Sequence, residues 1–153
     1  MGNCKCECDC DKNETINLLK EVNSGCKSAT NSCEQVLPYV KDEKLKNLIS
    51  QVNAQHVEIG DKCHDILNKM GEDEKDPPVI ASAMSWFGTE MKLIMGADSA
   101  KIAGLMMDGC NMGIQSIGKY INEYPCADKE VNSLAKKLIK VEEDFMTSLK
   151  EYL

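Results

Sequence analysis

Apolar residues recur at alternating steps of three and four along this chain, from about residue 14 to the C-terminus. Residues with this spacing lie on one face of an α-helix, and such a face is typical of helices that pack in a bundle. Over residues 42–70 the face includes His56 and Cys63, so both side chains are predicted to point inward. No stretch shows a strong period of two, which would indicate a strand.

Turn signals divide this pattern into five predicted helices. They lie at residues 41–42, 71–78, 96–98 and 125–128. The predicted helices span residues 14–40, 42–70, 77–95, 98–124 and 128–152. The third is a shorter connecting helix, and Asp98 or Ser99 and Asp128 are predicted N-caps. We therefore predict an all-α four-helix bundle with an additional connecting helix.

Composition bounds the class of protein. A chain of 153 residues that is 42% hydrophobic is long enough for one well-buried domain. Its net charge of −7 disfavours nucleic acid and anionic membrane surfaces as partners, because both repel an acidic body. No apolar stretch approaches the roughly 20 residues of a membrane span, and the polar N-terminus lacks the apolar segment of a signal peptide. We expect a cytoplasmic protein.

The N-terminus carries four cysteines that alternate with charged residues: Cys4, Cys6, Cys8 and Cys10. If residues 1–12 form a tail with an extended backbone, all four thiols lie on one side of it. Thiols at this spacing suit Zn, Cu(I) or an iron–sulfur cluster. The alternative is that they crosslink chains through disulfides. The domain prediction is thus a metal-binding or crosslinking tail at residues 1–12 and a helical bundle at residues 13–153.

A second candidate site lies at mid-depth in the predicted bundle. Helices joined by short turns run antiparallel, so depth can be counted from the turns at a rise of about 1.5 Å per residue. This counting places Cys26, His56, Cys110 and Glu142 within about one helical turn of a common plane. Two thiolates, an imidazole and a carboxylate suit Zn or copper and are tolerable for iron. The alternative is that the cysteines only fill space in the core and that His56, as a lone inward histidine, is hydrogen-bonded and binds no metal.

Other candidate ligands are assigned to packing or to the surface. Cys33 and Cys63 fall at other depths and are predicted packing residues. His64 lies off the inward face of its helix and is predicted to be at the surface. The chain has nine cysteines, an odd number, and four of them lie at helical positions, which disfavours a secreted disulfide scaffold.

The predicted connecting helix contains Ser85-Trp86 and Lys92, the break after it is Gly96-Ala97-Asp98, and Asp108-Gly109-Cys110 and Tyr120 follow the break. This order of elements and motifs resembles the ferritin-like superfamily. The similarity is to an uncharacterised bacterial group related to stress proteins, and it covers residues 14–153. It implies a ferritin-like bundle. Ferritin-like di-iron sites use Glu and Glu-x-x-His ligands, whereas this chain has Gln55-His56-Val57-Glu58 in its second helix.

These observations favour a function in metal handling. We expect a homo-oligomer that binds, stores or buffers a thiophilic metal, zinc or copper before iron. One alternative is a structural or assembly protein whose tail cysteines link subunits through metal or disulfides, and a second is a degenerate di-iron oxidoreductase. The sequence provides no positive case for an enzyme, since it shows no nucleophile with a partnering base and no phosphate-binding loop.

Overall fold

A computed structural model describes the backbone of residues 4–75 and 96–153 and the side chains of residues 11–75 and 96–153. Its elements are α1 (Cys4–Val36), η1 (Leu37–Tyr39), α2 (Glu43–Lys69), α4 (Ser99–Glu123), α5 (Lys129–Leu149) and η2 (Lys150–Tyr152). No strand occurs in the described part of the chain, so the prediction of an all-α bundle is confirmed. The connecting helix predicted over residues 77–95 lies outside the described residues.

Three aspartates fix where helices begin. The carboxylates of Asp42, Asp98 and Asp128 accept hydrogen bonds from backbone N–H groups in the first turns of α2, α4 and α5. These N–H groups have no partner within the helix, so each cap stabilises its helix by about 1 kcal/mol. At the other end of α2, Gly71 adopts a φ of 70°, a left-handed conformation that glycine accommodates without a Cβ clash.

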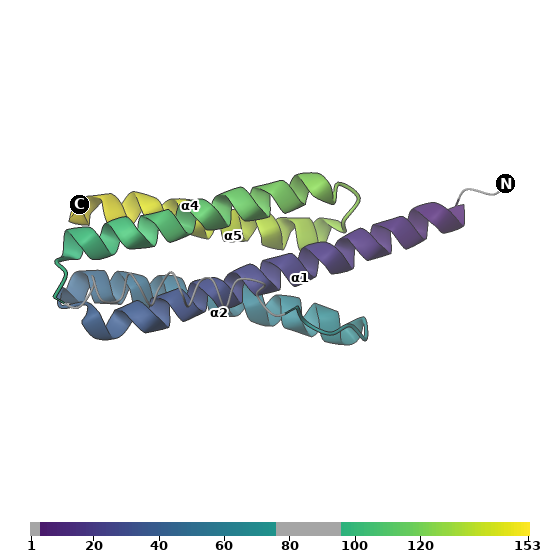
Figure 1. The fold of residues 1–153 in the computed structure, drawn as a ribbon. Coiled ribbons are helices and arrows are strands. Elements are labelled where there is room, and N and C mark those ends of the chain that lie inside the picture. The colour runs from purple at the N-terminus through teal and green to yellow at the C-terminus, as the bar shows by residue number, and fades with distance from the viewer. Residues whose placement is uncertain (1–3, 76–95) are drawn as a thin grey trace.

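The helices form two antiparallel hairpins that pack against each other (Figure 1). α1 pairs with α2 and α4 pairs with α5, while α1 also contacts both helices of the second hairpin. α2 and α4 run in the same direction (Figure 1). This is the arrangement assumed in counting depth from the turns.

The end of the second hairpin is hydrogen-bonded to α1. The backbone N–H of Cys126 donates to Oε2 of Glu14 at 2.6 Å, and that of Asp128 donates to Oγ1 of Thr15 at 2.8 Å. Both donors lie at the turn between α4 and α5. These contacts attach the two hairpins to each other at one end of the bundle.

The N-terminal segment differs from its prediction. α1 begins at Cys4 rather than near residue 14, so the backbone from Cys4 onward is helical and continuous with the bundle, not extended. The run contains acidic residues, which the positive end of the helix dipole favours near a helix N-terminus. The side chains of Cys4, Cys6, Cys8 and Cys10 lie outside the described ones, so the predicted tail site is not located. Within the described helices, none is both long and apolar enough to cross a membrane.

Candidate functional site

A hydrogen-bonded pair, His56 and Glu142, lies in the core of the bundle. Nε2 of His56, on α2, is 2.7 Å from Oε1 of Glu142, on α5. The two residues are only 1% and 6% exposed, and Glu142 is the one buried carboxylate among the described side chains. The sequence predicted that these residues, 86 positions apart, lie at one depth, and the structure brings them into contact.

The contact with Glu142 determines which nitrogen of His56 carries a proton. An ionised carboxylate can only accept hydrogen bonds, so Nε2–H of His56 donates to Glu142. In the neutral imidazole, Nδ1 then keeps a lone pair. Nδ1 is buried and has no hydrogen-bond partner among the described residues. A buried acceptor without a partner is costly, so this atom is available to a donor or a metal ion.

Three buried thiols lie near Glu142 and stay protonated. Burial, with the charge of Glu142 and a hydrogen bond to it, raises the pKa of Cys110. Burial, followed by the charges of Cys63 and Glu142, raises the pKa of Cys26. Burial, with the charge of Glu142, also raises the pKa of Cys33 to about 12. The sequence placed Cys33 at another depth, and depth counting missed its proximity to Glu142.

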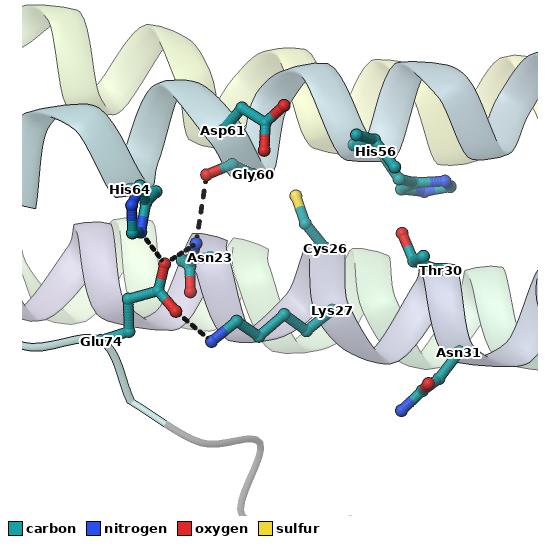
Figure 2. Close-up of a pocket in the computed structure, with 11 residues that line it drawn as sticks. Asn23, Cys26, Lys27, Thr30, Asn31, His56, Gly60, Asp61, His64 and Glu74 are labelled. Carbon is teal, nitrogen blue, oxygen red and sulfur yellow. Dashed lines mark hydrogen bonds and ion pairs between the residues drawn. The ribbon is translucent and has the colours of Figure 1, made fainter.

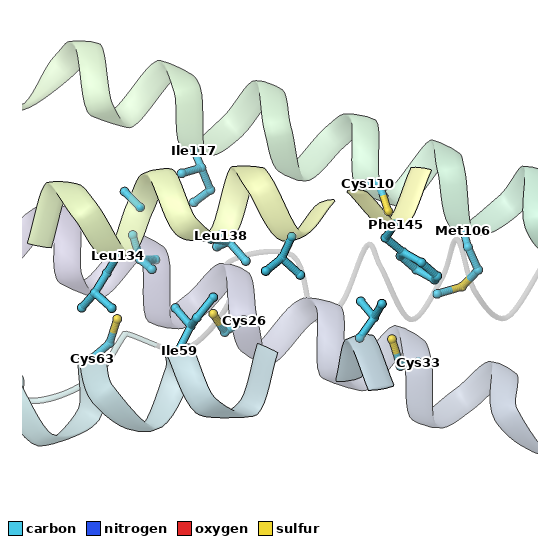
Figure 3. Close-up of a cluster of buried hydrophobic side chains, with 14 of the residues drawn as sticks. Cys26, Cys33, Ile59, Cys63, Met106, Cys110, Ile117, Leu134, Leu138 and Phe145 are labelled. Atoms are coloured by element: carbon cyan, nitrogen blue, oxygen red, sulfur yellow. The ribbon is translucent and has the colours of Figure 1, made fainter. Parts of the chain in front are cut away.

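The four residues predicted at one plane do not make a complete set of metal ligands. In the part of the chain with described side chains, no group of three or more His, Cys, Asp or Glu residues could hold a metal ion. Glu142 is instead engaged by His56 and Cys110. Figure 3 shows Cys26 and Cys110 among the apolar side chains of the core. What the structure assembles is a histidine oriented by a carboxylate, with thiols nearby.

A pocket of about 510 Å³ opens between α1 and α2 and reaches His56. Cys26 and Thr30 of α1 line it opposite His56 (Figure 2). Its other lining residues are mainly polar: Asn23, Lys27, Asn31, Val57, Gly60, Asp61, His64 and Glu74. The sequence did not predict this pocket, because polar residues make up most of its lining and add nothing to the apolar periodicity on which the prediction rested.

Residues 72–75, which follow α2, are tied to α1 by three ion pairs. Glu72 pairs with Lys20, Glu74 with Lys27, and Lys75 with Glu21. Glu74 also contacts His64, which is exposed, as the sequence predicted (Figure 2). Glu74 also lines the pocket.

Comparisons with known proteins found no counterpart. No family model matches the chain, and neither the curated proteins nor the solved structures include a match to it. The function must therefore be argued from the residues themselves.

Thiol reactivity tests the burial of these cysteines. Burial raises the pKa of Cys33 and of Cys63 to about 12. At pH 8 their thiolate fractions are then lower by roughly three orders of magnitude than those of ordinary thiols. We expect iodoacetamide to alkylate both at least 1,000-fold more slowly in the native chain than in urea, on the order of that thiolate ratio. Peptide mapping by mass spectrometry measures both rates, and equal rates in the two conditions would contradict the assignment.

Proposed function

We propose that this chain is a ferritin-like bundle that binds a thiophilic metal ion, zinc or copper, and buffers or delivers it. The observation that carries the proposal is the buried His56, whose Nε2 contacts Glu142 while Nδ1 has no partner in the described part of the chain. Histidines that bind metals usually donate their other ring N–H to a carboxylate or a carbonyl, which fixes the tautomer and the ring orientation. His56 has this arrangement. Cys26 lines the same pocket and would supply a sulfur ligand.

The donor types favour zinc or copper over iron. A ferritin-like di-iron site draws on several carboxylates from the bundle interior. Among the described side chains Glu142 is the only buried carboxylate, and cysteines take the neighbouring inward positions. Imidazole and thiolate together suit zinc and copper. The N-terminal cysteines would add further soft ligands to the same chain.

The topology supports the ferritin-like part of the proposal. α2, at the end of the first hairpin, and α4, at the start of the second, run in the same direction (Figure 1). Ferritin-like bundles, which have one long crossover connection, share this arrangement.

The proposal predicts zinc or copper in protein purified without chelator or affinity tag. Elemental analysis should find it in the wild-type chain and also in a full-length variant with Cys4, Cys6, Cys8 and Cys10 changed to Ser, which we call the tail-serine variant. In that variant, Glu142→Gln should weaken metal binding about 10–100-fold, because it removes the charged partner of His56 while keeping the side-chain shape. Competition with a chromogenic chelator measures the affinity.

The matched control is Glu143→Gln, since Glu143 is the exposed neighbour of Glu142. It should leave the affinity unchanged. Metal that disappears completely in the tail-serine variant would place binding in the N-terminal segment instead of the bundle. If neither wild type nor variants hold zinc or copper, metal binding is excluded as the function.

A further inference from the structure

A carboxylate of the chain itself lies among hydrogen-bond donors from two helices at the pocket between α1 and α2. Oε2 of Glu74 accepts a hydrogen bond from Nζ of Lys27. Oε1 of Glu74 accepts from Nδ1 of His64 and from Nδ2 of Asn23, the latter at 3.5 Å (Figure 2). An ionised carboxylate can only accept hydrogen bonds, so the three side chains around Glu74 are donors. They form a site for an oxyanion, and Glu74 occupies it.

Two of the three donors are held in place by contacts within α1 and α2. Nδ2 of Asn23, a residue that is 2% exposed, also donates to the backbone carbonyl of Gly60 at 3.1 Å. In the neutral imidazole of His64, Nε2 accepts from Nδ2 of Asn68 at 2.8 Å. These contacts do not involve residues 72–75. The two helices therefore position Asn23 and His64 independently of Glu74.

The site favours an anion with a single charge. The pKa of Glu74 lies below its ordinary value, mainly because Lys27 donates a hydrogen bond to it; burial opposes this effect, and the hydrogen bond from His64 adds to it. Asp61 also lines the pocket and brings a further negative charge. Like charges brought close together repel, so a carboxylate fits this lining better than a dianion does.

The pocket has room for more than a carboxylate, and Glu74 is weakly attached. The pocket volume is about 510 Å³, within the range of roughly 300–1,000 Å³ that is usual for small-molecule sites. Residues 72–75, which we call the strap, carry Glu74 into the site. The other two ion pairs of the strap, to Lys20 and Glu21 of α1, are partly exposed. Ion pairs in contact with solvent contribute little to stability, so the strap can leave while the helices stay folded.

We propose that Lys27, His64 and Asn23 form a binding site for a small molecule that carries one carboxylate, and that Glu74 occupies this site as a tethered substitute when such a molecule is absent. The carboxylate of the ligand takes the place of the Glu74 carboxylate, and the rest of the ligand lies in the pocket, which Thr30 and Asn31 also line. Binding thereby releases the strap from α1. Metal binding at His56 is not required for this exchange.

Acetate is the probe, and Glu74→Ala vacates the site. Titration of this variant with sodium acetate, at an ionic strength kept constant with sodium chloride, should shift the backbone amide NMR signals of Lys27 and His64 to saturation. In the wild-type chain acetate should bind at least about tenfold more weakly, because only the fraction of molecules with an open strap can accept it. Sulfate, a dianion, should bind Glu74→Ala more weakly than acetate does.

Two further variants test the assignment of residues. Lys27→Gln in the Glu74→Ala background should weaken acetate binding about tenfold, because a charge-assisted hydrogen bond is lost. Glu72→Ala is the matched control, since Glu72 belongs to the strap but does not line the pocket. It should bind acetate within about twofold of the wild-type chain, because it removes only a partly exposed ion pair.

Three results would overturn the proposal. If the amide signals of Glu74→Ala show no saturable response to acetate, the donors do not form a carboxylate site. If the wild-type chain binds acetate as tightly as Glu74→Ala does, acetate binds elsewhere and Glu74 is not its competitor. If sulfate binds more tightly than acetate, the ligand class is wrong.

Discussion

Replacing His56 with leucine should destabilise the bundle by about 3–5 kcal/mol, because the change leaves a buried charge without its partner. Glu142 is almost fully buried, and His56 is its hydrogen-bond partner across α2 and α5. Urea unfolding with linear extrapolation measures the loss of stability.

The double replacement is the informative control. When both members of the pair become apolar, the cost of burying the charge of Glu142 disappears together with its attraction to His56. The variant His56→Leu with Glu142→Leu should therefore be far more stable than the sum of the two single variants predicts. A double-mutant cycle gives the coupling energy directly. If the two single losses simply add, the contact between His56 and Glu142 contributes nothing, and the assigned tautomer loses its support.

The free energy of unfolding should fall steeply as the pH rises above about 9. Burial raises the pKa of Cys33 and of Cys63 from an ordinary value near 9 to about 12. The unfolded chain gives up these thiol protons near pH 9, whereas the folded chain keeps them until about pH 12. The stability that the two protonated thiols contribute is therefore fully present below pH 9. It is lost between pH 9 and 12, by about 1.4 kcal/mol per pH unit for each thiol. Urea unfolding at a series of pH values measures the slope.

Single alanine variants isolate the contribution of each thiol. Cys33→Ala and Cys63→Ala should each make the slope shallower by about 1.4 kcal/mol per pH unit. Val52→Ala is the matched control, since Val52 is buried but does not titrate. It should lower stability equally at every pH. A slope that is the same in all four proteins would show that these thiols keep ordinary pKa values when folded.

Sequence periodicity predicted the bundle and the depth of its centre for a physical reason. The spacing of apolar residues determines which face of a helix is buried, and the constant rise per residue converts sequence distance from a turn into axial distance. That is why His56 and Glu142 could be matched across 86 positions. Asp98 and Asp128 were predicted as caps because the capping chemistry is local.

Three features of the structure have no comparable signal in the sequence. Depth counting ignores side-chain direction. It therefore did not predict that Glu142 contacts His56 and Cys110, nor that the described side chains form no group of three or more metal ligands. The contacts of Glu74 join surface charges far apart in the sequence, and mixed charges on helical faces indicate only solvent exposure. The start of α1 at Cys4 was missed because residues 4–13 lack the apolar periodicity on which the prediction rested.

The hydrogen bonds from the turn between α4 and α5 to Glu14 and Thr15 also bear on the distant centre. An apolar interface between two hairpins tolerates sliding, since one methyl group can replace another at little cost. A slip of one helical turn would move Glu142 by about 5.4 Å along the bundle, which is too far to contact His56. Directional polar contacts at the end of the bundle oppose such a slip. The position of one hairpin along the other, which allows a histidine and a carboxylate to meet in the core, is therefore set in part by two backbone amides at the end of the bundle.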